Sequence, residues 1–144
     1  MNPIAIELEK RFEGYSEKPY LCPAGIPTAG YGHAFQKGEK IRPLPRDEAE
    51  KVLIQDNAKA EYSTFKHCPI LFLENQNRQA AIIDFVFNLG GGRLQASTLR
   101  RKINQRDWTG AQKEIVRWVY AGGRKLKGLI LRREVEAMLL IGVS

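Results

Sequence analysis

The stretch from Gln76 to Leu89, Q-N-R-Q-A-A-I-I-D-F-V-F-N-L, constrains the fold most, because it has the length of a helix and is apolar nearly all round. A helix that is apolar on every side is buried, with other elements packed against it from several directions. Gly90-Gly91-Gly92 then ends the helix. The sequence therefore predicts a central buried helix with further helices around it.

Further helices are predicted on both sides of this segment. Asn2 is a suitable N-cap and Pro3 a suitable first residue for a helix that stops at Gly14. The remaining four helices are expected at residues 46–65, 97–105, 107–119 and 128–141. Ser97 and Asp107 are the caps of the second and third of these four. In the last helix the residues expected to face inward are Leu129, Val135, Met138 and Leu139.

Residues 19–35 differ from the helical segments, because three prolines and three glycines alternate there with Tyr20, Ile26 and Tyr31. This pattern favours short strands joined by tight turns, either one antiparallel hairpin or a three-stranded sheet. At 144 residues and 43% hydrophobic composition, the chain fits one domain. The fold class predicted is α+β, mostly helical, with a small sheet near the N-terminus.

The basic residues are unevenly distributed. Residues 1–92 hold 11 basic and 12 acidic side chains, a sum of −1, whereas residues 93–144 hold 12 and 4, a sum of +8. Such a cationic half suits a polyanion, whether nucleic acid, an anionic cell-wall polymer or a layer of lipid headgroups. A solvated helix face that keeps the protein soluble is the alternative interpretation.

Cysteine and histidine usage argues against a metal site. Cys22 and Cys68 form no C-x-x-C pair, and His33 and His67 are the only imidazoles, so no metal and no cofactor are predicted. The first ten residues carry acids where a secretory signal would be apolar, and no run approaches about 18 apolar residues. We therefore expect a soluble cytoplasmic product.

Glu13 is a candidate general acid. It falls at the C-terminal end of the first predicted helix, where the negative end of the helix dipole and the apolar neighbours Phe12 and Tyr15 favour its protonated form. Cys22 and Thr28 on the facing hairpin could hold a water between them. Glycosidic cleavage usually employs two carboxylates and only one is placed here, so an exposed glutamate at a helix end remains the alternative.

Three blocks of the sequence resemble the phage-type lysozymes, glycoside hydrolase family 24, in their lambdoid branch. The spacing of Glu13, Cys22 and Thr28, followed by Gly-Tyr-Gly-His at residues 30–33, is similar to the active-site signature of that family. Residues 85–104 (F-V-F-N-L-G-G-G-R-L-Q-A-S-T-L-R-R-K-I-N) resemble its central helix and following turn. Residues 117–136 are similar to its C-terminal signature, so the resemblance covers almost the whole chain.

The resemblance implies a lysozyme-like fold of residues 1–144, with residues 1–45 forming one side of a cleft and 46–144 the helical part. It implies that Glu13 protonates the bond between N-acetylmuramic acid and N-acetylglucosamine, and that Thr28 positions the attacking water. Cys22 stands where most members have an aspartate; a thiol is mostly protonated at neutral pH, so we expect an auxiliary role. Arg132 or Arg133 is expected to pair with Glu13.

Four further residues are implied to bind the substrate. Gly32, with Gly30, lies where the backbone turns beneath a saccharide, and side chains there would block the cleft. His33 either orders the threonine region or ties the hairpin to the helices. Phe87 and Asn88 fall where the family lines its sugar-binding cleft, with core packing as the alternative for Phe87.

The function implied is that of an endolysin acting on peptidoglycan glycan strands. It is expected to be a monomer without a specific nucleic-acid partner, to wait in the host cytoplasm until another protein permeabilises the membrane, and to contact anionic membranes or cell surfaces through its basic half. Three alternatives stay open: a lytic transglycosylase, a non-enzymatic binder of polyanions or cell wall, and a cysteine hydrolase using Cys22 and His33.

Overall fold

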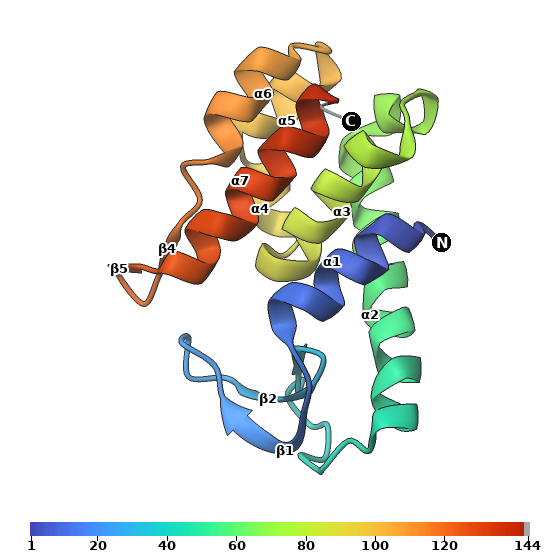
Figure 1. Cartoon of the computed structure of the whole chain (residues 1–144), viewed down its shortest axis with the longest axis vertical. Helices are drawn as coiled ribbons and strands as arrows, with labels where there is room; N and C mark the ends of the chain where they lie inside the picture. Colours follow the sequence, from blue (N-terminus) through green and yellow to red (C-terminus); the bar gives the residue numbers. More distant parts are fainter. Residues whose placement is uncertain (143–144) are drawn as a thin grey trace.

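The computed structural model describes residues 1–142, and Figure 1 shows helices above and beside a small antiparallel sheet. The predicted α+β class, mostly helical, is confirmed. The elements in chain order are α1 (Pro3–Glu13), β1 (Ser16–Leu21), β2 (Pro27–Gly30), β3 (His33–Ala34), α2 (Arg46–His67), the 3₁₀ helix η1 (Pro69–Leu73), α3 (Gln76–Leu89), α4 (Gly91–Gln95), α5 (Thr98–Asn104), α6 (Trp108–Ile115), β4 (Tyr120–Ala121), β5 (Arg124–Lys125) and α7 (Lys127–Ile141).

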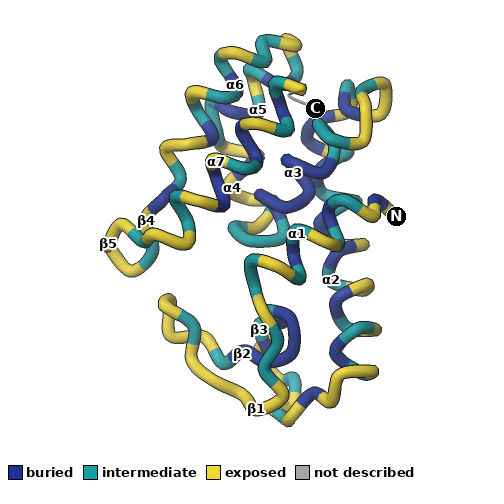
Figure 2. Tube along the Cα trace, viewed as in Figure 1, coloured by how far each residue is buried: buried dark blue, intermediate teal, exposed yellow. Residues whose placement is uncertain are grey.

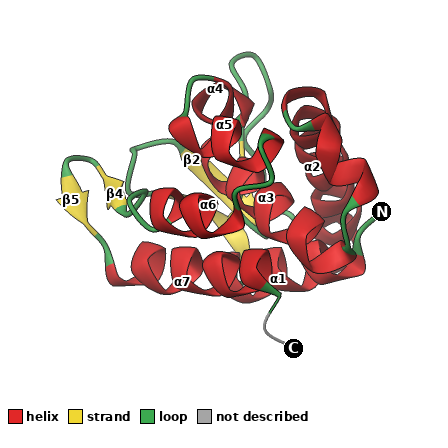
Figure 3. Cartoon of the chain, turned by 90° about the horizontal axis from the view of Figure 1, so that it is seen from above, coloured by secondary structure: helices red, strands yellow, loops and turns green. Residues whose placement is uncertain are grey.

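Helix α3 is the central helix, as predicted. Every residue from 80 to 86 is buried, and α1, α2, α4 and α7 all pack against it. Seen from above, α3 lies between α7 with α1 on one side and α4 with α5 on the other (Figure 3). The helix begins at the Asn75 cap, whose side chain accepts a hydrogen bond from the Arg78 N–H, and ends at Gly90 with a φ of 90°.

Helix α1 has the predicted ends, and these fix the position of Glu13. The Asn2 side chain accepts hydrogen bonds from the Ile4 and Ala5 N–H groups at 3.0 and 3.1 Å. Gly14, with a φ of 66°, ends the helix, because a positive φ strains any residue that has a Cβ. Glu13 is therefore the last residue of α1.

The sheet near the N-terminus has three strands in the order β1-β2-β3, both pairs antiparallel. Of the two predicted forms, the three-stranded one is correct. Tyr20 pairs with Thr28 and Ala29 with His33. Beyond β1 the chain turns at Cys22, whose carbonyl accepts a hydrogen bond from the Gly25 N–H at 2.8 Å. Figure 2 shows that β1 and this turn are mostly exposed.

Two clusters of buried apolar side chains hold the molecule together. The larger is formed by α1, α3, α5, α6 and α7, and the smaller by β2, the segment up to Leu44 and the first half of α2. Helix α2 contributes Ala49 and Leu53 to the smaller cluster and Ala60 to the larger one. Phe87 packs against both. The sheet is thus attached to the helices through α2 and Phe87.

The inward face of α7 differs from the prediction. Met138 is 53% exposed, so its predicted inward position was wrong, whereas Leu139 packs against the larger core and Leu129 and Val135 are half-buried. The buried residues are Arg132, Arg133, Glu136, Ala137 and Leu140. The apolar pattern misassigned this face because three of its five residues are ionisable and are buried against one another.

The length and composition of the helices show whether one of them could cross a membrane. The 22 residues of α2 mix charged and apolar side chains along the helix, with Asp47 and Glu48 in its first turn. Within residues 1–142 no helix combines the length and the apolar composition needed to cross a bilayer.

Candidate active site

The Glu13 carboxylate is paired with Arg132. Arg132 Nη1 donates a hydrogen bond of 2.5 Å to Glu13 Oε2, although the two residues lie 119 positions apart in the chain. The Glu13 side chain is 19% exposed and that of Arg132 is 4% exposed. Of the two arginines predicted as partners, the structure selects Arg132. Arg132 therefore holds the Glu13 carboxylate in place by a charge-assisted hydrogen bond.

Arg132 is itself held by Asp84 on α3. Its Nε and Nη2 donate to the two oxygens of Asp84 at 2.9 and 2.8 Å, while Nη1 remains for Glu13. The guanidinium also lies 5.3 Å from the centre of the Phe12 ring. Asp84 is not among the residues predicted from the sequence, although one signal was present: it is the only acid in the otherwise apolar α3.

Arg133 points to a different set of partners. Its Nη2 donates to Asn88 Oδ1 at 2.8 Å and to Glu136 Oε2 at 3.1 Å. Burial raises the pKa of Glu136 well above its usual value, and a hydrogen bond with Asp84 adds to the effect. Burial also acts to raise the pKa of Asp84, but the charge of Arg132 and hydrogen bonds from Glu136 and Arg132 outweigh it and lower that pKa. Glu136 therefore holds the proton that these two carboxyls share.

Gly32 makes room for Glu13. Its φ is +72°, and a Cβ built on it would fall 2.6 Å from Cδ and 2.7 Å from Cγ of Glu13. Any side chain at position 32 would displace the carboxylate. Gly30 is different: a Cβ there would meet Leu44 at 3.0 Å and Ala49 at 3.2 Å, in the smaller core. The expectation that Gly30 keeps the cleft clear was therefore wrong, since its absent side chain leaves space for core packing.

Thr28 and Cys22 flank the same hairpin. Thr28 is buried on β2 and donates its hydroxyl proton to the Ile26 carbonyl at 2.9 Å, which leaves oxygen lone pairs to accept from a water. Cys22 is half-buried at the turn after β1. Burial raises the pKa of Tyr20, and the charges of Glu13 and Cys22 add to this, so Glu13 and Cys22 share the neighbourhood of Tyr20.

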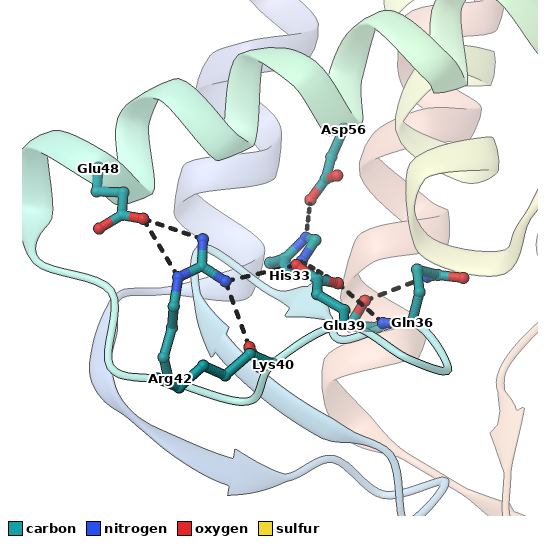
Figure 4. Close-up of polar contacts among 8 residues, drawn as sticks. His33, Gln36, Glu39, Lys40, Arg42, Glu48 and Asp56 are labelled. Atoms are coloured by element: carbon teal, nitrogen blue, oxygen red, sulfur yellow. Dashed lines mark hydrogen bonds and ion pairs between the residues drawn. The ribbon is translucent and has the colours of Figure 1, made fainter.

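Both ring nitrogens of His33 are engaged by carboxylates (Figure 4). Nδ1 lies 2.7 Å from Asp56 Oδ2 on α2, and Nε2 lies 2.9 Å from Glu39 Oε2 in the loop after β3. The hydrogen bond to Asp56 outweighs burial and, with that to Glu39, raises the pKa of His33. This arrangement favours the role in which His33 ties the sheet to the helices, because neither nitrogen is left for a substrate.

A second glutamate lies one turn before Glu13 and is fully buried. Burial raises the pKa of Glu9 to about 8, although a hydrogen bond from Asn57 opposes this. Asn57 Nδ2 contacts both carboxyl oxygens of Glu9, at 2.9 and 2.6 Å. Glu9 is thus protonated at neutral pH. The sequence did not reveal it, because its place in α1 reads as an ordinary charged helix position.

A groove of about 300 Å³ includes Gly32, the glycine that lies against Glu13, in its lining, whereas Glu13 itself does not line it. Gly32, His33 and Gln36 line one side, and Phe87, Gly90 and Gly91 line the other, with α2 behind them. Of the predicted substrate residues, Gly32, His33 and Phe87 therefore meet in one groove, whereas Asn88 turns to Arg133. A larger hollow of about 530 Å³ over α4 and α5, between Gln95 and Gln105, shares no residue with the site.

Comparison with known proteins identifies the family to which a chain with this arrangement belongs. The family model described as phage lysozyme matches residues 10–136, which include Glu13, the sheet and the paired arginines. The chain belongs to the phage lysozyme family. The resemblance expected from Glu13, Cys22, Thr28 and the two later blocks is confirmed.

Individual members of the phage lysozyme family align over most of the chain. It is 38% identical over 127 residues to a SAR-endolysin of bacteriophage PS34, covering 86% of this chain and 73% of that protein. It is 37% identical over 138 residues to an endolysin of Acyrthosiphon pisum secondary endosymbiont phage 1, covering 92% and 91%. The solved endolysin from Escherichia coli O157:H7 phage FAHEc1 superimposes with a TM-score of 0.83 at 26% identity, covering 97% and 92%.

Proposed function

We propose that the protein is a peptidoglycan hydrolase of the endolysin class that cleaves the β-1,4 bond between N-acetylmuramic acid and N-acetylglucosamine. The observation that carries the proposal is the half-buried Glu13, held between the Gly32 backbone and the Arg132 guanidinium. The family and its endolysin relatives support the same activity. Membership of this family therefore favours a glycosidase over a non-enzymatic binder of polyanions.

Glu13 supplies the acid in this proposal. Glycosidic cleavage requires a proton on the leaving oxygen, given by a carboxyl group that is screened from bulk water. The side chain of Glu13 is 19% exposed, so its carboxyl is shielded but can be reached from solvent. Gly32 and Arg132 fix its direction, which is the positioning that acid catalysis needs.

Thr28 holds the attacking water in this proposal, and Cys22 assists it. The Thr28 hydroxyl gives its proton to the Ile26 carbonyl, so its oxygen is an acceptor that orients a water. Cys22, at the turn after β1, shapes the pocket as a neutral thiol and provides no second carboxylate.

The groove beyond Glu13 takes the glycan strand in this proposal. Phe87 offers an apolar face from α3, and Gly90, with open space around it, allows a ligand close to the backbone. Residues 1–45 would form one side of the cleft and residues 46–144 the other, within one domain. Asn88, fixed by Arg133, would present its amide N–H groups to the substrate near the cleft.

Product analysis tests the proposal. Purified peptidoglycan is digested, and the new reducing ends are identified by mass spectrometry. N-acetylmuramic acid at the reducing end is the expected product, and Glu13→Gln should release none. A 1,6-anhydro end would instead indicate a lytic transglycosylase, and binding without new ends would indicate a polyanion-binding protein; either result contradicts the proposed hydrolase.

We also infer that the chain acts as a monomer and meets the cell wall after the membrane has been permeabilised, by analogy with its endolysin relatives. The basic residues after position 92 would add contact with anionic surfaces. Leakage from anionic liposomes caused by Glu13→Gln protein would support a membrane contact that is independent of hydrolysis. Absence of leakage would contradict it.

A further inference from the structure

A group of ionisable side chains lies between α1, α3 and α7, directly behind Glu13. Its members are the carboxyls of Glu9, Glu13, Asp84 and Glu136 and the guanidiniums of Arg132 and Arg133. Five of the six residues are buried, Glu13 being the exception. Because burying net charge is costly, the four carboxyls and two cations are balanced when two of the carboxyls carry protons.

The surroundings show which two carboxyls are neutral. Glu9 is fully buried, its carboxyl oxygens contact the uncharged amide nitrogen of Asn57, and burial raises its pKa to about 8, so Glu9 is one of the two. Burial raises the pKa of Glu136 well above its usual value, whereas the charge of Arg132 outweighs burial and lowers the pKa of Asp84, so Glu136 is the second neutral carboxyl. The charges that remain are those of Asp84, Glu13, Arg132 and Arg133, and they cancel.

We propose that Asp84 is a positioning residue for the hydrolysis: it fixes Arg132 and takes up its charge, so that Glu13 faces a guanidinium that is already paired. This inference rests on the proposed function. Two of the three hydrogen bonds of Arg132 go to Asp84, and these set the direction of the third, which goes to Glu13. Asp84 has no exposed surface, so it acts through Arg132 and not on the substrate.

The need for such a counter-charge follows from the task of the acid. An unpaired cation within about 4–6 Å of a carboxyl favours its ionised form by roughly one to three pH units, which would leave little proton to donate. The other groups that face Arg132 and Glu13 do not remove this charge. Glu9 on α1 is neutral, Glu136 on α7 lies against Arg133, with its Oε1 2.8 Å from Arg133 Nε, and burial raises the pKa of Tyr20 on the hairpin, which also carries Cys22.

The test is the pH dependence of kcat/KM for release of reducing ends from peptidoglycan. Asp84→Asn keeps the shape of the side chain and removes its charge, so the whole cation acts on Glu13. The alkaline limb is expected to move to lower pH by roughly one unit, with about tenfold less activity above it. Asp47→Asn, an isosteric change at an exposed position in the first turn of α2, should leave the profile unchanged.

A second variant covers the case in which Asp84→Asn does not fold. Asp84→Asn combined with Arg132→Gln removes both charges of the pair, so that no buried charge is left alone. Its alkaline limb is expected close to that of the parent, whereas Arg132→Gln alone should move the limb to higher pH. Thermal melting of each variant shows which are folded.

The outcomes separate this inference from the proposed function. A parent protein that releases no reducing ends contradicts the hydrolase itself. If the parent is active, two results contradict the role of Asp84. One is a folded Asp84→Asn variant whose alkaline limb lies at the same pH as that of the parent. The other is a double variant whose alkaline limb moves to as high a pH as that of Arg132→Gln alone.

Discussion

The backbone of Gly32 lies directly against the side chain of Glu13, so that a Cβ at position 32 would fall 2.7 Å from Cγ of the glutamate. The Gly32 backbone thus confines the Glu13 side chain on one side, and the hydrogen bond from Arg132 holds its carboxylate on the other. Glu13 is fixed by a strand connection and by a helix that are remote from it in the sequence.

Gly32→Ala is expected to abolish most activity. The new methyl group pushes the Glu13 carboxyl away, and a displacement of about 1 Å at a reacting group costs roughly a hundredfold in rate. The positive φ adds about 1 kcal/mol of strain. Turbidity loss of peptidoglycan and thermal melting measure the two effects. Gly38→Ala is the matched control, since Gly38 has a φ of +88° but open space around it; it should lose stability and keep activity. Equal activity in both variants would contradict this account.

Cys22→Ser is expected to keep more than about a tenth of the parental rate, whereas Glu13→Gln should show none. A neutral thiol and a hydroxyl can both hold a water by hydrogen bonding, but neither an amide nor a water replaces an acid. Lysis of chloroform-treated Gram-negative cells provides the measurement. Thr28→Val and Cys22→Ser together should be worse than either alone if both hold the same water. Loss of activity in Cys22→Ser as complete as in Glu13→Gln would show that the thiol takes part directly.

His33→Asn is expected to reduce stability most at acid to neutral pH. The pKa of His33 is raised in the folded state by its carboxylate partners, so the stabilisation is fully present below the unfolded value of about 6.5 and is lost as pH rises through the folded value. Melting temperatures at pH 6 and pH 9 measure this. The parent should exceed His33→Asn by more at pH 6. A constant difference between the two proteins would rule out the charged pair as its source.

Glu9→Gln is expected to reduce the change in the free energy of unfolding between pH 5 and pH 8. The folded pKa of Glu9 is raised from 4.5 to about 8, so the parent is most stable below pH 4.5 in respect of this group and loses stability as pH rises toward 8. The loss cannot exceed about 1.4 kcal/mol per pH unit for one proton. Urea unfolding at pH 5 and pH 8 measures it, with Glu7→Gln, at an exposed position of the same helix, as control. If the free energy of unfolding of Glu9→Gln fell as much between pH 5 and pH 8 as that of the parent, a protonated Glu9 would be contradicted.

What the sequence could predict depended on whether the signal was local. Asn2, Pro3 and Gly14 act within a few residues of themselves, so the bounds of α1, and with them the place of Glu13, followed from pattern. The apolar run of α3 likewise predicted burial directly. Strands β4 and β5 have two residues each, which is too short for a periodicity to reveal them.

The contacts among the buried polar side chains could not be predicted from the sequence pattern. Arg132 and Asp84 are 48 residues apart and Arg132 and Glu13 are 119 apart, and no spacing rule connects them. The same pairs explain the error on α7, where ionisable residues occupy the face that apolar periodicity assigned to Met138. Only family resemblance led to Arg132 or Arg133, and it did not choose between them.

The separation between Glu13 and Arg132 has a consequence for the order of events during translation. A ribosome makes α1 and the hairpin first and α7 last, and α7 supplies the cation that orients the acid. Until residue 132 has left the exit tunnel, the carboxylate has no partner and the cluster behind it is incomplete. Nascent chains and fragments that end before α7 are therefore without an assembled catalytic centre, and the lytic activity proposed here requires a chain that includes α7.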